Sequence, residues 1–355
     1  GYNTALVSTV YNMINGQRFP MSLTTPQPDY LHVFFDACVQ SGVEYVVMEV
    51  AAQALSLHRV HGIEFDGIIF TNLDQEHAEF YPTMDDYFAA KALIFEQCKP
   101  NAPQLINGDD PRCASVQGQY KNIIKFGITG EKLNVRADVS QPIKHGISFT
   151  TIIDGVSCAF VCPSLIGMFN VYNLLGVVTL ATKLGIAPDA IVHALQTFQK
   201  VPGRLEQYHM PNGARCIIDY AHNPSSYQAV LSTLRALTPH LIVVFGCGGN
   251  RDKSKRPLMG AIATEIADAV ILTSDNPRSE KAEDIIADIK QGITQEHAHK
   301  VVCELDREIA IKKAYALSKN GSIVVLLGKG PDEYQMVGMV KTPFSESGII
   351  KSLCA

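Results

Sequence analysis

From about residue 215 to residue 330, short apolar runs alternate with segments of helical periodicity. The apolar runs are rich in β-branched residues and have the length of strands: 216–220, 241–246, 269–274, 300–305 and 322–328. Between them, apolar residues recur every three or four positions, as on one face of a helix, in 225–237, 258–267 and 282–293. Continuous apolar strands separated by helices predict a parallel sheet covered on both faces, which is a Rossmann-like doubly wound α/β domain.

The loops after these predicted strands are polar and unusual in sequence. They read AHNP (221–224), GCGGNRDKSKRP (246–257), DNPR (275–278) and GKGPDEYQ (328–335). In an open α/β sheet, ligands bind beyond the carboxyl ends of the strands. The pattern therefore predicts a binding site built from these loops.

The first 200 residues have a more mixed pattern. Strand-like runs at 43–50 and 67–73 alternate with helical stretches, and a β-rich patch at 146–164 precedes a long apolar helix at 170–185. Pro202 and Gly203 interrupt the pattern. We therefore expect two α/β domains, 1–204 and 205–355.

Composition narrows the class of protein. The 355 residues carry a formal charge of −5, which argues against nonspecific nucleic-acid binding because that binding relies on clustered positive charge. No apolar stretch is long enough to cross a bilayer, and no signal peptide is apparent. Nine cysteines at irregular spacing indicate free thiols in a reducing compartment. These features predict a cytoplasmic protein that binds neither nucleic acid nor membrane.

Three residues of the first domain are candidates for a shared metal site. Glu49 ends one predicted strand, His77 follows another, and Lys91 lies in an alanine-rich helical stretch. A carboxylate and an imidazole at adjacent strand ends can hold a divalent cation. Taken singly, each residue is more simply explained as a hydrogen-bonded polar group at a strand end, and Lys91 as a solvated helix residue.

The stretch DNPR at 275–278 allows two interpretations. Asp and Asn favour turns and helix caps, and Pro favours the first turn of a helix, so the stretch can be a simple turn. Alternatively, Arg278 lies at the strand end in order to bind the carboxylate of a ligand. The polar character of the neighbouring loops favours the second interpretation.

Seven motifs occur together in an order that resembles the Mur ligase family. They are TNLDQEHAEFYPTMDDYFAAKALIF, GMFNVYNLLGV, VPGRLEQ, IIDYAHNP, FGCGGNRDKSKRPLMG, SDNPRSE and GKGPDEYQ, and the resemblance runs over essentially the whole chain. Together they look like the branch that adds the third amino acid of the peptidoglycan stem. In that family ATP phosphorylates a carboxylate, and an incoming amine displaces the phosphate to form an amide.

The resemblance assigns roles to individual residues. ATP and Mg²⁺ are implied, with Glu49, His77 and a carbamylated Lys91 as metal-binding and catalytic residues. Further residues match family positions: Asn170, Asn173, Arg204, Asp219 and His222 for ATP, and Thr24, Thr25 and Arg59 for the UDP-N-acetylmuramoyl-L-Ala-D-Glu substrate.

The loop DNPR resembles the version that accepts meso-diaminopimelate. Diaminopimelate differs from lysine by one carboxylate, which a guanidinium can bind in a bidentate manner. Arg278 and Arg251 are the candidates for carboxylate contacts, Asn276 and Gly328 for seating the distal amino-acid end, and Asp332 for its ammonium. Asp275, in the same loop, completes the amino-acid-binding set.

Some features depart from the family pattern. Ala51 and Ala52 stand where the family has two serines, and Pro331 and Asp332 where it has His and Glu. The chain contains no phosphate-binding loop of the form GxxxxGKS/T, and it opens with Gly1 in what reads as the middle of a fold. We therefore expect a fragment that lacks the UDP-binding domain and is inactive by itself.

Three other functions stay open at this point. They are a lysine-adding ligase of the same branch, an enzyme like folylpolyglutamate synthetase, and a noncatalytic protein that has kept its ligand binding. Glutamate has no distal ammonium to seat, so the DNPR and GKG loops argue against the folylpolyglutamate alternative. We expect the protein to be a monomer.

Overall fold

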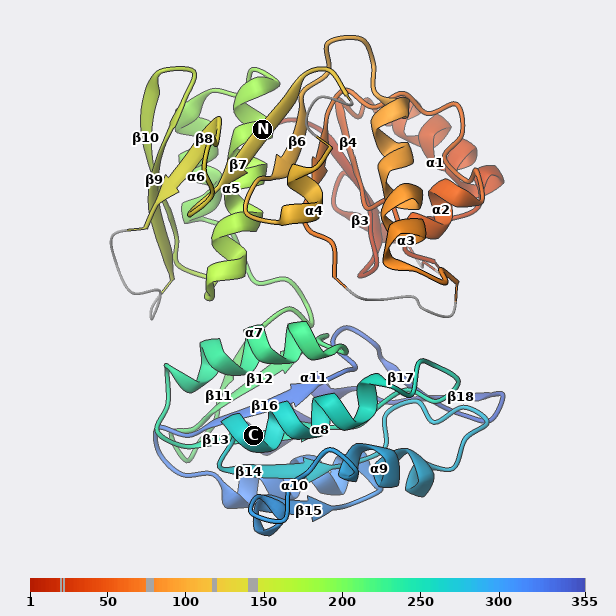
Figure 1. Ribbon diagram of the computed structural model, residues 1–355, viewed down its shortest axis with the longest axis vertical. Helices are drawn as coiled ribbons and strands as arrows, with labels where there is room; N and C mark the ends of the chain where they lie inside the picture. The colour runs from red at the N-terminus through yellow and green to blue at the C-terminus, as the bar shows by residue number, and fades with distance from the viewer. Residues whose placement is uncertain (20, 22, 75–79, 117–119, 140–145, 355) are drawn as a thin grey trace. The chain divides into compact units, whose positions relative to one another are not determined.

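The computed structural model describes residues 1–19, 21, 23–74, 80–116, 120–139 and 146–354 (Figure 1). The chain divides into two compact units. One comprises Gly1–Arg136 and Leu175–Ile186, and the other Ala137–Leu174 and Ala187–Ala355. We call them the first and the second unit.

The second unit is built on a six-stranded sheet with the order β11-β12-β16-β13-β14-β15. Its strands are β11 (Glu206–His209), β12 (Arg215–Asp219), β13 (Leu241–Phe245), β14 (Ala269–Leu272), β15 (Val301–Cys303) and β16 (Ile323–Leu327). All neighbours are parallel except β11, which pairs antiparallel with β12. Strands β13 and β16 are buried along their whole length, as expected for central strands that are covered on both faces.

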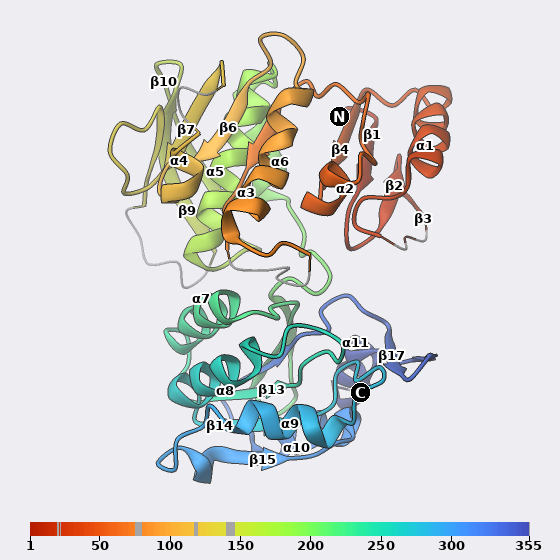
Figure 2. The same ribbon diagram turned by 45° about the vertical axis from the view of Figure 1, so that its right-hand side comes forward.

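Helices cover both faces of this sheet (Figures 1 and 2). The elements are α7 (Pro224–Arg235), α8 (Lys255–Ile266), α9 (Ala282–Lys290), α10 (Arg307–Leu317) and α11 (Glu346–Cys354), with a 3₁₀ turn at Ala298–Lys300. Alternate residues of β13 point to opposite faces, so Val243 and Phe245 join the cluster under α7, α8 and α9, while Ile242 and Val244 join the cluster under α10 and α11.

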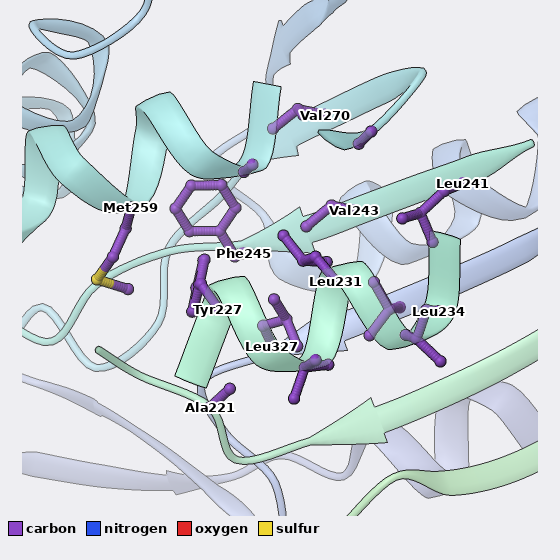
Figure 3. Close-up of a cluster of buried hydrophobic side chains, with 14 of the residues drawn as sticks. Ala221, Tyr227, Leu231, Leu234, Leu241, Val243, Phe245, Met259, Val270 and Leu327 are labelled. Carbon is purple, nitrogen blue, oxygen red and sulfur yellow. The ribbon is translucent and has the colours of Figure 1, made fainter. Parts of the chain in front are cut away.

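Figure 3 shows the first of these two clusters. Tyr227, Leu231 and Leu234 of α7 lie on one stripe of the helix and pack against Phe245 and Leu327. The Tyr227 and Phe245 rings meet edge to face with centroids 5.2 Å apart. Local sequence fixes where the helix begins, because Asn223 and Ser226 form a capping box and Pro224 follows the cap.

The second unit contains further elements outside the main sheet. A hairpin of β17 (Tyr334–Val337) and β18 (Val340–Pro343) follows β16. Antiparallel strands β9 (Ile147–Ile153) and β10 (Val156–Cys162) pair along seven residues, and β10 contacts α6 (Pro188–Gln196).

The first unit holds two groups of strands. In the first group, β1 (Thr4–Val7) pairs parallel with β4 (Tyr45–Met48) and antiparallel with β2 (Asn12–Ile14), which also pairs with β3 (Gln17–Phe19). In the second group, β5 (Ile68–Phe70), β6 (Gln104–Asn107), β7 (Ile123–Gly127) and the start of β8 (Val135–Asp138) are parallel. The helical elements are α1 (Pro28–Gln40), α2 (Ala52–Ser56), α3 (Met84–Ala92), the 3₁₀ turn Leu93–Gln97 and α4 (Pro111–Ala114).

Helix α5 (Met168–Lys183) is the long apolar helix that the sequence predicts. Its residues 168–174 belong to the second unit and its residues 175–183 to the first. In the first unit Gly176 lies so close to the sheet that a Cβ there would be 3.1 Å from Ile69 Cγ2 and 3.3 Å from Phe126 Cζ. A glycine therefore lets this helix approach the strands closely.

The mixed α/β fold with a doubly wound second domain is confirmed, and the five apolar runs all contain strands. No helix in the described ranges is both long and apolar enough to cross a bilayer. Pro277 does not begin a helix, because α9 starts only at Ala282, but the Glu280 amide donates to the Pro277 carbonyl over 3.0 Å, so the stretch does lead into a turn. All nine cysteines are free, as expected.

Candidate functional site

The DNPR loop is held in place by backbone bonds from two other loops. The amide of Gly249 donates to the Asn276 carbonyl over 2.9 Å. The amide of Arg278 donates to the Met336 carbonyl over 3.1 Å, and the amide of Gly338 donates to the Arg278 carbonyl over 2.7 Å. Arg278 thus forms a bridge to the β17–β18 hairpin, and these bonds hold its backbone at φ 53°, in the left-handed region that non-glycine residues rarely occupy.

The side chains of Arg278 and Arg251 approach the same point. Arg278 is half-buried and donates from Nη1 to the Gly249 carbonyl over 2.8 Å, while Arg251 is exposed. A Cβ on Gly248 would lie 3.0 Å from Arg278 Nη1 and 3.7 Å from Arg251 Cγ. The structure therefore brings the Arg278 guanidinium and the aliphatic stem of Arg251, the two residues that the sequence predicts as carboxylate contacts, to the same glycine.

A buried ion network fastens the glycine-rich loop to the DNPR loop. Arg256 is fully buried and donates from Nη1 to Glu280 Oε2 over 2.9 Å and to Asp288 Oδ2 over 2.8 Å. Glu280 also accepts a bond of 2.5 Å from the Asn250 amide. The hydrogen bond from Arg256 lowers the pKa of Glu280 to about 2, so this carboxylate stays ionised at neutral pH.

Lys329 is a buried cation beneath the same loop. Its side chain is 0 % exposed, and Nζ donates to Asn276 Oδ1 over 3.1 Å and lies 3.8 Å from Asp275 Oδ1. Burial lowers the pKa of Lys329, while the nearby Asp275 carboxylate opposes that shift. Gly328 makes room for this arrangement, because a Cβ there would lie 2.5 Å from Asp275 Oδ2.

Asp332 lies in the same group of loops. It is partly buried, and burial raises its pKa, whereas the charge of Lys329 and a hydrogen bond with Tyr334 oppose the increase. Its amide donates to the Lys329 carbonyl over 2.9 Å. All six residues predicted to bind the amino acid therefore come from loops at the carboxyl edge of the second unit's sheet or from the turn that leads into the hairpin.

Two of the predicted ATP residues, Arg204 and His222, also lie together, around Tyr220. The Arg204 guanidinium carbon lies 4.6 Å from the centre of the Tyr220 ring, and the His222 ring meets Tyr220 edge to face at 5.1 Å. His222 is exposed, and its Nδ1 is 2.8 Å from the Tyr220 carbonyl oxygen. Arg204 Nη1 is buried without a hydrogen-bond partner within the described ranges.

The remaining predicted ATP residues bond to the protein itself. Asp219 is 7 % exposed and accepts hydrogen bonds from the amides of Leu205 and Ala221, each over 2.8 Å. Its carboxylate therefore fixes the backbone at Leu205, the first residue of the predicted second domain, to the loop after β12. Burial raises the pKa of Asp219, and these two bonds oppose the increase. At the start of α5, Asn173 Nδ2 donates to Asn170 Oδ1 over 3.0 Å, and Asn170 Nδ2 donates to the Ile166 carbonyl over 2.9 Å.

In the first unit, Glu49 and the predicted dipeptide-binding residues lie together. Glu49 is exposed, and its Oε2 accepts from the amide and hydroxyl of Thr9 over 2.9 and 2.8 Å. The Thr9 hydroxyl also shares a hydrogen bond of 3.0 Å with the Thr24 hydroxyl. Thr25 is buried, and its hydroxyl donates to the Glu49 carbonyl and accepts from the Ala51 amide, each over 2.9 Å. Arg59 Nη1 donates to the Thr25 carbonyl over 3.3 Å.

Lys91 occupies the last turn of α3, and its Nζ faces aromatic rings. It lies 5.2 Å from the centre of the Tyr87 ring and 5.8 Å from that of Phe70, the last residue of β5. Ala52, three residues after Glu49, packs in one cluster with Tyr87 and Ala90 of α3. His77, the third predicted metal ligand, lies outside the described residues. The ranges that the structure describes hold no group of three His, Cys, Asp or Glu side chains fit for a metal ion.

Sequence reasoning missed several residues that build these sites. Thr9, Tyr220, Arg256, Glu280 and Lys329 were given no role, although all but Thr9 lie inside the quoted motifs. Their roles depend on contacts between loops that are far apart in the chain, such as Lys329 with Asn276. The one signal in the sequence for these residues is that most of them lie in loops that follow predicted strands.

Comparison with known proteins agrees with this geometry. The family model described as the Mur ligase middle domain matches residues 2–181, and that of the Mur ligase glutamate ligase domain matches residues 203–330. A relative from Aquifex aeolicus named UDP-N-acetylmuramoyl-L-alanyl-D-glutamate–2,6-diaminopimelate ligase is 39% identical over 359 residues, which cover 99% of this chain and 72% of that protein.

Solved structures give the same result. A structure of a ligase of that name is 30% identical, with a TM-score of 0.66 over 99% of this chain and 72% of that one. The folylpolyglutamate synthase of Mycobacterium tuberculosis, solved with ADP and AMPPCP, has a TM-score of 0.68 over 92% of this chain and 82% of that one, but it is 16% identical and shows the fold alone. From its sequence matches over nearly the whole chain, this protein belongs to the Mur ligase family.

Proposed function

We propose that this protein is an ATP-dependent ligase that joins meso-diaminopimelate to UDP-N-acetylmuramoyl-L-alanyl-D-glutamate. The observation that carries the proposal is that Arg278 and the stem of Arg251 meet beside Gly248, among loops that also carry the buried Asn276 and the partly buried Asp332. Two guanidinium groups suit a ligand with two carboxylates, and Asp332 offers a carboxylate to an ammonium group. The names of the sequence relatives support the same substrates.

The amino-acid site would select its ligand by charge. Diaminopimelate and lysine share one amino-acid end, and only diaminopimelate carries a second carboxylate. The backbone of Arg278 is fixed by Met336 and Gly338, and its guanidinium is held by the bond from Nη1 to the Gly249 carbonyl before a ligand arrives. Preorganised donors lose less conformational entropy on binding, so they discriminate strongly between ligands with and without the second carboxylate.

Amide formation requires that the glutamate carboxylate be activated. The carboxylate oxygen attacks the γ-phosphorus of ATP, ADP leaves, and an acyl phosphate forms. The diaminopimelate amine then attacks the acyl carbon, phosphate leaves with the bonding electron pair, and the amine gives up a proton. Holding amine and acyl phosphate together supplies much of the rate.

The chain's own residues suit the nucleotide and the dipeptide substrate. Arg204 and His222, grouped at Tyr220, would contact ATP, together with Asn170 and Asn173 at the start of α5. Asp219 would act indirectly, by holding the Leu205 and Ala221 amides. Thr24 and Arg59 would contact the UDP-muramoyl dipeptide, while the buried Thr25 positions the loop that carries Glu49.

The donor set around Glu49 fits a magnesium ion. Glu49 is an exposed carboxylate beside the hydroxyls of Thr9 and Thr24, and Mg²⁺ prefers such oxygen ligands. Glu49, His77 and a carbamylated Lys91 would hold the ion, which when bound neutralises phosphate charge. Before carbamylation, the faces of the Tyr87 and Phe70 rings would attract the Lys91 ammonium and hold Nζ in place.

We also propose that the reaction takes place in the cytoplasm and that the protein acts as a monomer. Nine free thiols are the expected state in a reducing compartment.

The test is ATP-dependent product formation by the protein as its gene encodes it. With UDP-N-acetylmuramoyl-L-Ala-D-Glu as acceptor, we expect meso-diaminopimelate to give an amide product and ADP, and L-lysine and L-glutamate to give little of either. Arg278→Ala should reduce kcat/KM for diaminopimelate by about 10- to 100-fold, the worth of one charged hydrogen-bond group.

Arg235→Ala is the matched control. Arg235 forms an ion pair with Asp268, which precedes β14 and so marks the opposite edge of the sheet from the DNPR loop. This variant should keep the kcat/KM of the unchanged protein. Equal product formation with lysine, or no dependence on ATP, would contradict the proposal.

A further inference from the structure

The Asn276 side chain has one orientation that its surroundings permit. Its Oδ1 accepts two hydrogen bonds, from Lys329 Nζ over 3.1 Å and from the Met336 amide over 2.9 Å. Both partners can only donate, so a rotated amide would point its own N–H groups at two other donors. The carboxamide oxygen must therefore face Lys329 and the hairpin, and the nitrogen must face the other way.

The Asn276 nitrogen is left without a partner. Asn276 is 5 % exposed, and within the described part of the chain its Nδ2 makes no hydrogen bond, whereas its carbonyl and its Oδ1 are both occupied. Within the described residues this N–H group has no acceptor in the protein, and it is not among the side-chain atoms that are fully closed off from solvent, so an incoming ligand can supply the acceptor. Arg278, two residues further along the same loop, brings a second donor group.

Lys329 also increases the donor strength of that nitrogen. A full positive charge bonded to Oδ1 polarises the amide, and this effect is strong where water is excluded. Lys329 is 0 % exposed and lies between the Tyr334 and Phe344 rings, each 5.7 Å from Nζ to the ring centre. Such a lysine cannot reach a ligand itself, so its effect must pass through Asn276 or Asp275.

We propose that Lys329 is a positioning residue for specificity: it fixes Asn276 so that Nδ2 donates to the carboxylate that diaminopimelate has and lysine lacks. This inference rests on the proposed function, because it names the group that reads the second carboxylate at the same site. Asp275 holds the charge of Lys329 in place from the other side, with 3.8 Å between Nζ and Oδ1.

The experiment measures the dissociation constants of meso-diaminopimelate and L-lysine by calorimetry, in the presence of the nonhydrolysable nucleotide AMPPCP, for the unchanged protein and for Lys329→Met. Methionine has a similar length and no donor. We expect the affinity for diaminopimelate to fall about tenfold and the affinity for lysine to stay within about threefold, so the preference for diaminopimelate shrinks. If Lys329 had a purely structural role, Lys329→Met would lower the affinity for both ligands by the same factor, and that result would overturn the inference.

Asn276→Asp is the second variant, and it leaves Lys329 and Asp275 untouched. Aspartate keeps the oxygen that faces Lys329 but replaces the outward donor by a carboxylate oxygen. The variant should therefore no longer prefer diaminopimelate over lysine, while its melting temperature stays that of the unchanged protein. If Asn276→Asp still prefers diaminopimelate, the nitrogen does not face the second carboxylate and the inference is wrong.

The two failures can be told apart. If the unchanged protein itself shows no preference for diaminopimelate over lysine, the proposed function fails and this inference with it. If the unchanged protein has the preference and both variants keep it, only the role of Lys329 is wrong.

Discussion

The loops at the carboxyl edge of the second unit's sheet and the loop around Glu49 in the first unit hold charged side chains in opposite ways. In the second unit Arg256, Arg307 and Lys329 are fully buried beneath the site. In the first unit Glu49 is exposed, and its carboxylate is held by one threonine, Thr9. The buried cations can only shape the protein, whereas Glu49 keeps an oxygen open to a ligand. The difference shows which charges build a site and which bind at it.

The largest expected effect is on the buried pair of Arg307 and Glu346. Arg307 donates from Nε to Glu346 Oε1 over 2.8 Å, and both side chains are almost fully excluded from water. Arg307→Leu leaves a buried carboxylate without its cation and should lower the free energy of unfolding by about 3–5 kcal/mol, measured by urea denaturation.

The control for this change is the double variant Arg307→Leu with Glu346→Leu. Removing both charges should restore much of the lost stability, because a well-packed apolar pair replaces an ion pair at little cost. If the single variant is as stable as the unchanged protein, the buried charges do not build the site, and the contrast between the two units fails.

The next largest effect concerns Thr25, where the first unit uses a buried neutral group for the same purpose. Thr25→Val keeps the shape of the side chain but leaves the Ala51 amide and the Glu49 carbonyl without their partner. We expect a loss of about 1–3 kcal/mol in the free energy of unfolding. Thr150→Val, on the exposed face of β9, is the matched control and should change stability little. A similar effect in both variants would mean that Thr25 does not hold the Glu49 loop.

A smaller effect on stability is expected when the pH is lowered and Glu280 becomes protonated. Its pKa falls from the ordinary value of 4.5 to about 2 in the folded protein, so its contribution to stability is complete above pH 4.5 and is lost as the pH falls toward 2. Glu280→Gln should therefore make the fall of melting temperature between pH 4.5 and 2 shallower.

Glu283→Gln removes the same charge from an exposed position on the first turn of α9 and serves as the control. If the melting temperature of both variants falls equally steeply between pH 4.5 and 2, the hydrogen bonds from Arg256 do not stabilise the Glu280 carboxylate as the structure indicates.

Glu49→Gln should have the smallest effect on stability. The glutamine oxygen can still accept from Thr9, so we expect a change within about 0.5 kcal/mol. Activity should nevertheless fall, and the Mg²⁺ concentration needed for half-maximal activity should rise, because an anionic ligand is lost. A large loss of stability here would remove the contrast with the second unit.

Much of this picture could be predicted from the sequence, because the relevant signals are local. The apolar runs at 241–246 and 322–328 became the fully buried strands β13 and β16, since a run of branched apolar residues has few other stable environments. Arg278 and Asp332 were identified because they follow strand ends in recognisable motifs.

Other parts could not be predicted from the sequence. Strand β11 is short and polar and lies at the sheet edge, and the β17–β18 hairpin carries exposed residues, so neither shows a strand pattern. The roles of Lys329 and Thr9 depend on partners 53 and 40 positions away, Asn276 and Glu49. Contacts of that kind are set by how the loops meet, which periodicity does not encode.

The most direct test of the central claim is whether the second unit's loops discriminate by the second carboxylate. The measurement is the melting temperature of this chain with saturating meso-diaminopimelate and with the same concentration of L-lysine, since a ligand that binds only the folded state must stabilise it. We expect diaminopimelate to raise the melting temperature of the unchanged chain clearly more than lysine does, and this difference to vanish in Arg278→Ala. An equal increase with both ligands in the unchanged chain would contradict the claim.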